Sequence, residues 1–319
     1  MLIINRKSSN PFFNIAAEEY LVKNIDEPCF MLWQNSPSVI IGKHQNPLKE
    51  VNLEFTQKHS IPIIRRISGG GTVYHDLGNI NFSFIDFGKR ESLVNFAKYS
   101  QPIIDLLQKL KINAYLDGKS DLKIDGLKFS GNASHVYKDR VLHHGTLLFN
   151  SDLNILNESI KIHKSTITDK AVNSNRTKVC NISEFLKIDT TIEEFKQELL
   201  SHIKMQFPQA REVHFSKNQE QEIQKLADEK YTTWEWNFGY SPRYFVNASI
   251  MIEGATKEFI TEVYKGFIQN ISCDSSLPNS LQKALLTIKG KQHEIKTISA
   301  CILDNSLGEY HDVLMEILF

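Results

Sequence analysis

The stretch RRISGGGTVYHDLGNIN, residues 65–81, carries three consecutive glycines after two arginines and before a histidine and an aspartate. Glycine weakens helix and strand interiors, but it accepts positive φ and lets a ligand approach the main chain closely. Successive N–H groups in such a turn can form an anion-binding concavity, and flanking arginines recognise phosphate or carboxylate with paired hydrogen bonds. The stretch therefore predicts a phosphate-binding loop, although a solvent-exposed glycine turn explains the three glycines alone equally well.

The two commonest nucleotide-binding loops do not fit the sequence. A Walker A loop ending in Gly118-Lys119-Ser120 would need a glycine five residues before Gly118, where Asn113 stands. The G-x-G-x-x-G spacing of the dinucleotide fingerprint is also missing. Any nucleotide would therefore be held by a less common loop.

The segments around the glycines predict strands interleaved with helices. Upstream, residues 30–34, 38–46 and 61–67 are rich in apolar and β-branched side chains, as in strands. Downstream, residues 80–86 alternate apolar and smaller polar side chains, as in a half-buried strand. A helix is expected after Asn10, with Pro11 in its first turn. This pattern indicates a mixed α/β class.

The stretch LKIDGLKFSG, residues 122–131, predicts a β-hairpin, because Asp-Gly suits a two-residue type I′ turn. Ile124 would face Leu127, Lys123 would face Lys128, and Leu122 would face Phe129. Like charges across a hairpin should lower the pKa of both lysines, and Lys128 would then need an anion to stay charged. A surface lysine on an edge strand is the alternative.

His143 and His144 are adjacent on a predicted strand, VLHHGTLLFN. Neighbouring side chains on a strand point to opposite faces, so the two imidazoles cannot bind one metal ion without a bulge. We expect His144 to line the site and His143 to be buried and hydrogen-bonded.

The rest of the chain predicts helices, one long loop and a second domain. Residues 92–110 have helical periodicity, with Pro102 marking a kink or a second start. Residues 151–180 are polar and have no long periodic run, and we interpret much of this segment as a mobile loop. Residues 191–207 predict an amphipathic helix opened by a capping box. The chain changes character after the WEWNFGYSPRYF segment, and we place a domain boundary near residue 247.

Composition excludes several protein classes. The 319 residues are 41% hydrophobic, and 37 basic residues balance 37 acidic ones, so no net charge favours nucleic acid or an anionic membrane. None of the four cysteines forms a C-x-x-C pair, and no apolar run approaches the roughly 20 residues of a membrane span. We expect a reduced, cytoplasmic protein.

Four segments together resemble bacterial lipoate–protein ligases over about residues 10–245: RRISGGGTVYHDLGN, DGLKFSGNA, HHGTLLFN and WEWNFG. The resemblance implies an α+β fold, in which a catalytic domain with a mixed β-sheet of the biotin/lipoate ligase type (residues 1–246) precedes a small C-terminal α/β accessory domain (residues 247–319). It also implies two reaction steps. Lipoate and ATP give lipoyl-AMP and pyrophosphate, and the lipoyl group then passes to a lysine of an acceptor lipoyl domain.

The resemblance also implies roles for single positions. Lys128 would be the catalytic residue, contacting lipoate and the adenylate phosphate and neutralising charge there. The ATP and adenylate contacts would be Arg66, Ser68, Gly70, Gly71, Thr72, Val73, Tyr74, Asn79, Asp121 and Lys128. The lipoate contacts would be Arg66, His75, Lys128, His144, Trp33, Ile15 and Ala17, although the apolar ones could equally be ordinary core. Asp121 would hold Mg²⁺, and residues 172–183 would close over the adenylate.

The implied partners are lipoyl domains of 2-oxoacid dehydrogenase E2 subunits or the glycine-cleavage H protein. Three alternatives stay open. A cysteine-thioester octanoyl or lipoyl transferase would need Cys180 as its nucleophile, with Lys178 as the basic neighbour. A non-catalytic lipoyl-domain-binding protein would keep the fold without turnover. A biotin ligase would carry a different glycine–arginine signature.

Overall fold

The computed structural model describes residues 1–89, 92–160, 167–174, 177–273 and 276–319. The chain divides into two compact units. The first unit comprises Met1–Lys43, Val51–Lys161 and Ser174–Thr233, and the second comprises His44–Glu50, Ile162–Asn173 and Trp234–Phe319. Residue 247, near which the domain boundary was expected, lies within a strand of the second unit.

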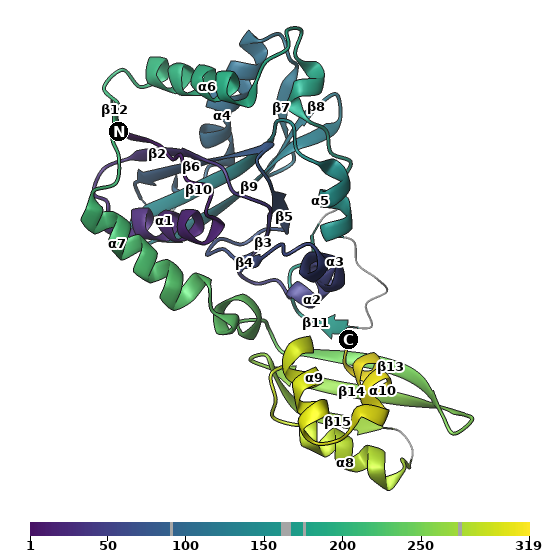
Figure 1. Ribbon diagram of the computed structural model, residues 1–319. Coiled ribbons are helices and arrows are strands. Elements are labelled where there is room, and N and C mark those ends of the chain that lie inside the picture. Colours follow the sequence, from purple (N-terminus) through teal and green to yellow (C-terminus); the bar gives the residue numbers. More distant parts are fainter. Residues whose placement is uncertain (90–91, 161–166, 175–176, 274–275) are drawn as a thin grey trace. The chain divides into compact units, whose positions relative to one another are not determined.

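The first unit is built on an eight-stranded mixed sheet in the order β12-β1-β2-β6-β10-β9-β8-β7 (Figure 1). β1 pairs in parallel with β2 and β12, and all other neighbours are antiparallel. The strands are β1 Leu2–Asn5, β2 Cys29–Trp33, β6 Asn79–Phe87, β7 Ala114–Asp117, β8 Asp121–Ile124, β9 Leu127–Tyr137, β10 Arg140–Leu148 and β12 Arg211–Glu212. The predicted α+β class with a mixed sheet is confirmed.

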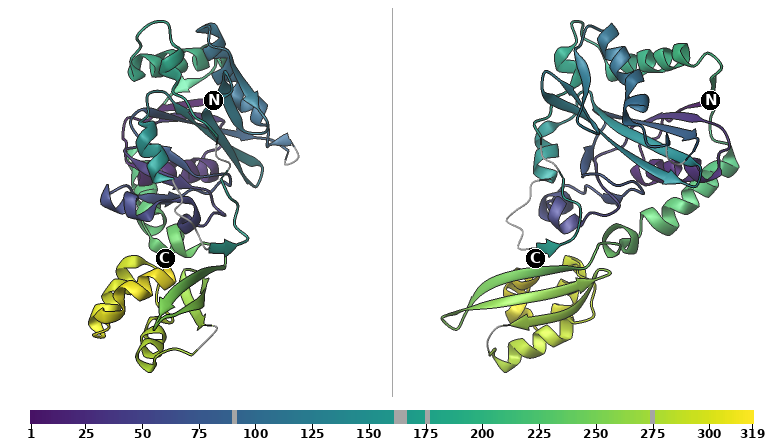
Figure 2. Two further views of the ribbon diagram at one scale, coloured as in Figure 1. Left: turned by 90° about the vertical axis from the view of Figure 1, so that its right-hand side faces the viewer. Right: turned by 180° about the vertical axis from the view of Figure 1, so that it is seen from behind.

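The two faces of this sheet differ because side chains alternate along β6. Phe82 and Phe84 lie in a hydrophobic core that also contains the buried sides of α4 (Phe96–Lys109) and α6 (Ile192–Gln206). Ser83, between them, instead donates to Glu18 of α1 (Pro11–Asn24) at 2.6 Å, so α1 covers the opposite face. Figures 1 and 2 show this layering within the first unit.

Local signals set the helix boundaries. The Oδ1 atom of Asn10 accepts the N–H groups of Phe12 and Phe13, which starts α1 where the sequence predicts. The capping box that opens α6 is also present, and Pro102 lies inside a continuous α4. The first unit also contains α3 Leu53–Lys58, α5 Leu153–Ser159, the 3₁₀ turn Ile182–Phe185, α7 Lys217–Leu226 and the π-helical turn Ala227–Tyr231.

A three-stranded sheet in the order β4-β3-β5 carries the glycine run. Its strands are β3 Ser38–Ile41, β4 Ile63–Arg65 and β5 Val73–His75. Residues 66–72, here called the glycine loop, connect β4 to β5. Both flanking strands pair with β3, so the two ends of the loop are fixed on one scaffold.

The predicted hairpin forms between β8 and β9. Asp125 and Gly126 have φ values of 49° and 83°, as a type I′ turn requires. Lys123 faces Lys128 as predicted, but Leu122 pairs with Ser130 instead of Phe129. The expected Leu122–Phe129 pair was wrong, because a β-bulge between Leu122 and Lys123 shifts the register.

Residues 151–180 are more regular than predicted. Asp152 caps helix α5 through the N–H groups of Asn154 and Ile155, and β11 (Ile167–Asp169) pairs with a strand of the second unit's sheet. The expectation of one long loop was therefore wrong for α5 and β11, and part of it, residues 161–166 and 175–176, lies outside the described residues.

The second unit has a four-stranded antiparallel sheet in the order β11-β13-β14-β15, with helices on one face (Figure 2). Its other elements are α2 Pro47–Glu50, the π-helical turn Glu235–Gly239, β13 Tyr244–Ile252, β14 Ala255–Tyr264, β15 Phe267–Cys273, α8 Asn279–Ile288, α9 Ile295–Asp304, the 3₁₀ turn Gly308–Tyr310 and α10 His311–Leu318. In the described part of the whole chain, we find no helix long and apolar enough to cross a membrane.

Candidate active site

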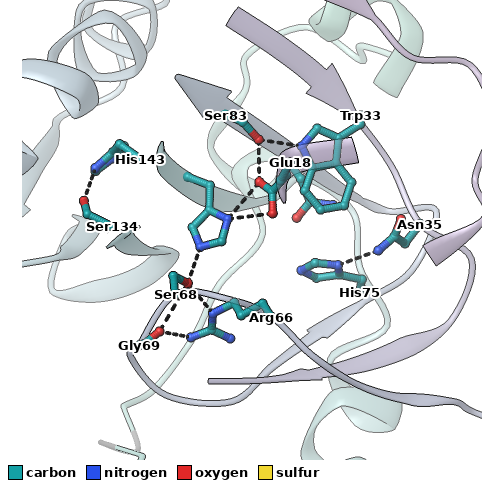
Figure 3. Close-up of polar contacts among 12 residues, drawn as sticks. Glu18, Trp33, Asn35, Arg66, Ser68, Gly69, His75, Ser83, Ser134 and His143 are labelled. Atoms are coloured by element: carbon teal, nitrogen blue, oxygen red, sulfur yellow. Dashed lines mark hydrogen bonds and ion pairs between the residues drawn. The ribbon is translucent and has the colours of Figure 1, made fainter. Parts of the chain in front are cut away.

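The side chain of Arg66, the first residue of the glycine loop, is buried and hydrogen-bonds to the rest of the loop (Figure 3). Its Nη2 donates to the carbonyl oxygens of Gly69 and Gly71, both at 2.7 Å. Its Nη1 donates to the carbonyl of Ile40 at 3.1 Å, and its Nε donates to Ser68 Oγ at 2.9 Å. Four of the five guanidinium N–H donors are thus engaged with the protein. The principal contacts of Arg66 are with the loop that was predicted to bind nucleotide.

The loop's conformation needs glycine at one position above all. Gly70 has φ of +87°, and a Cβ atom there would lie 3.0 Å from Nη2 of Arg66. Burial lowers the pKa of Arg66 to about 10, while the charge of Glu18 opposes that shift. Arg66 therefore stays protonated at neutral pH and holds the loop's carbonyl oxygens.

The glycine loop also donates a backbone hydrogen bond, from Thr72, to the hydroxyl oxygen of Ser174. The N–H of Thr72 donates to Ser174 Oγ at 2.9 Å, and Gly71 also lies against Ser174, where a Cβ atom would come within 3.1 Å of the hydroxyl oxygen. Ser174 belongs to the segment predicted to close over an adenylate. A hydroxyl oxygen at this N–H agrees with an oxygen-binding loop.

A buried chain of polar groups leads from α1 to the glycine loop. His144 Nδ1 contacts both carboxylate oxygens of Glu18, at 2.8 and 2.9 Å, and His144 Nε2 lies 2.7 Å from Ser68 Oγ. Glu18 also accepts from Ser83, whose Oγ in turn accepts from Trp33 Nε1 at 2.9 Å. A carboxylate only accepts, so Nδ1 of His144 carries a proton and donates to Glu18. This chain orients His144 and, through Ser68, Arg66.

Glu18 is the main site residue that sequence reasoning missed. It is only 1% exposed and lies in a helix most of whose residues are buried. A carboxylate is rarely buried without partners. Glutamates within the apolar stretch NIAAEEYLV were the available signal that this helix faces polar partners.

His75, at the end of β5, is 3% exposed and lies edge-on to Trp33, with ring centroids 5.8 Å apart. Asn35 Nδ2 lies 3.1 Å from its Nδ1. Burial, and then the positive charge of Arg66, lower the pKa of His75 to about 3. The ring is therefore neutral across the physiological pH range.

Lys128 projects from β9 and pairs with Asp121 of β8, with Nζ 2.9 Å from Oδ1. Gly131 makes room for it, because a Cβ atom there would lie 3.3 Å from Cε and Nζ of Lys128. The backbone of Lys128 also bonds to the segment predicted to close over an adenylate, donating to the carbonyl of Lys178 and accepting from the N–H of Cys180. Lys128 is thus a partly exposed ammonium group on a fixed backbone.

The predicted effect of facing lysines on pKa was wrong for Lys123. Its Nζ lies 2.7 Å from Asp117, and this hydrogen bond is the main reason why the pKa of Lys123 is raised. Lys128 has its own partner in Asp121. Each lysine therefore has its own carboxylate, which the repulsion argument did not include.

The adjacent histidines separate as predicted. His143 stacks on Tyr99 in the core formed with α4 and hydrogen-bonds to Ser134, whereas His144 lies on the α1 face. Across the described residues, no three histidine, cysteine or acidic side chains gather as metal ligands would. Cys180 is 1% exposed, and burial raises the pKa of its thiol to about 11, so it is poorly suited to act as a nucleophile.

The remaining candidates lie in α1, β5 and β6. Ile15 and Ala17 are fully buried in α1, and Tyr74 is buried in the core under the three-stranded sheet. Val73 is half-buried at the start of β5. Asn79 begins β6, and its Nδ2 donates to Asn81 at 2.9 Å. Within the first unit, the predicted site residues thus come from the glycine loop, α1, β2, β5, β6, β8, β9 and β10.

Comparison with known proteins places these residues in a wider context. The family model "Lipoyl protein ligase A/B catalytic domain" matches residues 10–204. The chain is 36% identical to lipoate-protein ligase LplJ of Bacillus subtilis over 97% of its own length and 96% of that protein. It is 40% identical to lipoate–protein ligase 1 of Staphylococcus aureus, covering 84% and 82%. The structure matches the lipoate complex of Plasmodium falciparum LipL1 with a TM-score of 0.64, 27% identity and 98% coverage of both chains.

Proposed function

Because the chain belongs to the lipoyl protein ligase family, we propose that the glycine loop, Lys128 and the buried Glu18–His144–Ser68–Arg66 chain form its catalytic site. The protein is an ATP-dependent lipoate–protein ligase. A solved lipoate-protein ligase A with bound ATP is 28% identical and has a TM-score of 0.63, covering 75% of this chain and 98% of the other. The observation that carries our assignment of the site is Arg66, which turns the loop's carbonyl oxygens inward.

The reaction needs activation, since a carboxylate and an amine at neutral pH form a salt and not an amide. In the first step, a lipoate carboxylate oxygen attacks the α-phosphorus of ATP, and pyrophosphate leaves. We assign the backbone N–H groups of residues 70–72 to the phosphate oxygens. Lys128 meets the same phosphate and neutralises charge that develops there. Its pairing with Asp121 keeps a charged ammonium in place before the nucleotide binds.

In the second step, the acceptor lysine attacks the acyl carbon of lipoyl-AMP, a carbon–nitrogen bond forms, and AMP leaves. The acceptor is a lipoyl-accepting protein. We propose a lipoyl domain of a 2-oxoacid dehydrogenase E2 subunit or the glycine-cleavage H protein. Support comes from a solved Thermoplasma acidophilum bipartite lipoate protein ligase with its E2 lipoyl domain, which is 26% identical to this chain.

The remaining assignments are part of the same proposal. His75, His144, Trp33, Ile15 and Ala17 would surround the acyl chain of lipoate, and Ser68, Val73, Tyr74 and Asn79 would surround the adenylate. The first unit, which holds most of residues 1–246, would form the catalytic domain, and the second unit, which includes residues 247–319, would form an accessory domain. The cytoplasmic location expected from the cysteine pattern remains a prediction.

Mg²⁺ fits the site only as a companion of ATP. It is usually held by one or two carboxylates together with substrate phosphates, and Asp121 is a partly exposed carboxylate beside Lys128. Asp121 would hold the ion, which neutralises phosphate charge when bound.

Lipoate-dependent exchange of pyrophosphate into ATP tests the proposal. Lys128→Ala should abolish exchange, whereas Lys123→Ala, on the facing strand and paired with Asp117, should retain it. Cys180→Ala should also retain it, because the thioester alternative is the one that needs this thiol. Exchange that survives Lys128→Ala in folded protein would remove Lys128 from its assigned role. No exchange in folded wild-type protein would restore the thioester alternative, because a cysteine-thioester transferase has no use for ATP.

A further inference from the structure

The hydrogen-bond network behind His75 fixes which ring nitrogen carries the proton. Asn14 Nδ2 donates to the backbone carbonyls of Ser8 and Gln34, both at 2.9 Å, which identifies that atom as the amide nitrogen. The same nitrogen lies 3.0 Å from Asn35 Oδ1. If Asn35 were turned over, two amide nitrogens would face each other. The Nδ2 of Asn35 is therefore the donor that reaches His75 Nδ1.

This donor determines the tautomer of the imidazole. A nitrogen that accepts a hydrogen bond has no proton, so Nδ1 of His75 is bare and Nε2 carries the hydrogen of the neutral ring. If both ring nitrogens of His75 were protonated, the Nδ1–H group would face the Nδ2 donor of Asn35. The strongly lowered pKa of His75 agrees, since burial and the nearby Arg66 charge both favour the neutral form.

The Nε2–H group of His75 is a buried donor without an acceptor in the described part of the protein. Unsatisfied buried donors are rare and destabilise a fold. His75 is the last residue of β5, the strand that follows the glycine loop, and its ring lies against Trp33. Figure 3 shows the ring projecting from Asn35 toward the side of the site on which Arg66 and Ser68 lie.

We propose that His75 is a fixed, neutral hydrogen-bond donor for the carboxyl group of lipoate, and that its Nε2–H binds the oxygen that does not attack ATP. This inference rests on the proposed function. His75 lies between Trp33, a candidate for the acyl site, and the glycine loop, the candidate for the phosphate site. This position favours a contact with the carboxyl group, where the acyl group and the phosphate are joined. In lipoyl-AMP the same oxygen is the acyl carbonyl oxygen. A neutral donor there stabilises negative charge when the acceptor amine attacks.

Selective ¹⁵N labelling of histidine tests the tautomer. In the full-length protein, the spectrum should show His75 protonated at Nε2 and unprotonated at Nδ1 from pH 5 to 9, with no titration. Saturating lipoate and ATP should shift the Nε2–H resonance. A proton on Nδ1, titration near the ordinary histidine pKa of about 6.5, or an unchanged resonance with both ligands bound would overturn the proposal.

Two substitutions test the donor in the exchange assay. His75→Phe removes the donor and should lower kcat/KM for lipoate roughly 10- to 100-fold, the range expected when a buried hydrogen bond loses its donor. His75→Gln should recover most of that loss, because its amide oxygen can accept from Asn35 while its NH₂ group replaces Nε2–H. KM for ATP should stay within about threefold in both variants.

His143→Phe is the matched control, since His143 is also buried, has no partner at Nε2 among the residues that the structure describes, and lies on the other face of β10. It should leave exchange unchanged. Equal activity of the phenylalanine and glutamine variants at position 75, or a loss confined to KM for ATP, would overturn the carboxyl assignment. If His75→Phe does not fold, the NMR titration decides alone. Wild-type protein without exchange activity would count against the proposed function, whereas active wild type with an indifferent His75 would count only against this inference.

Discussion

Arg66→Lys should separate a loop-holding role from a simple requirement for positive charge. Lysine keeps the charge but cannot span the carbonyl oxygens of Gly69 and Gly71, which Nη2 binds at 2.7 Å each, together with Ser68. Hydrogen bonds from charged donors contribute about 1.5–3 kcal/mol each. With one of these three bonds recovered by the ammonium, the loss of the other two is about 3–6 kcal/mol. At 1.4 kcal/mol per factor of ten, this corresponds to a fall of roughly 100- to 20,000-fold in kcat/KM for ATP.

Lipoate-dependent ATP–pyrophosphate exchange, measured against ATP and against lipoate, is the assay. Arg65→Lys is the matched control, because Arg65 is equally buried but donates to the carbonyls of Gly42 and Lys43, before the loop. Both variants should lose stability in urea unfolding, whereas only Arg66→Lys should lose most of its activity in folded protein. An Arg66→Lys enzyme within threefold of wild type would refute the claim that this guanidinium organises the loop.

Two further predictions concern backbone strain and pH. Gly70→Ala should reduce the free energy of unfolding by about 1–2 kcal/mol, since the φ of +87° at this position is costly for alanine. Gly69→Ala should be tolerated, because no atom lies within 4 Å of the added Cβ. Equal losses of stability in urea titrations of the two variants would contradict this difference. Burial lowers the pKa of His75 and His143 to about 3, so the unfolded chain binds more protons than the folded one between about pH 3 and 6.5, and stability should fall as pH falls through this window. From pH 7 to pH 5, each such histidine lowers the free energy of unfolding by about 2 kcal/mol. The His143→Phe variant should therefore lose about 2 kcal/mol less stability than wild type over that interval. Identical pH dependence of the two proteins would show that His143 is not buried in its neutral form.

Local rules predicted the parts of the fold that depend on a few neighbouring residues. Asn10 before Pro11 starts α1 because the cap is a contact within one turn. Asp125-Gly126 forms the predicted turn because both residues tolerate positive φ. His143 and His144 separate because a strand alternates its side chains. The glycine loop was predicted for the same reason, since the run of glycines itself signals its conformation.

The remaining features depend on contacts between distant segments. The bulge at Leu122–Lys123 is set by how β8 pairs with β9 and has no mark in the hairpin sequence. β11 is a three-residue strand that exists because β13 pairs with it. The partition of the chain into two units, each assembled from three segments, follows from such pairings. No change in composition near Lys43 or Glu50 predicts it.

The buried polar chain was the least predictable part of the site. Glu18 and His144 are 126 positions apart and meet at 2.8 Å. The sequence shows which residues could form buried polar pairs, but only the packing of α1 on the sheet decides which carboxylate contacts which imidazole. The same holds for Asp117, because its contact with Lys123 raises the pKa of Lys123, which was expected to be lowered.

The most direct test of the central claim is a crystal structure with a non-hydrolysable lipoyl-adenylate analogue. Our account predicts that the group replacing the α-phosphate lies within hydrogen-bonding distance, about 3 Å, of the backbone N–H groups of residues 70–72 and of Lys128 Nζ. Arg66 should keep its bonds to the carbonyls of Gly69 and Gly71. An analogue bound with this group away from the loop, or with Lys128 still paired only to Asp121, would contradict it.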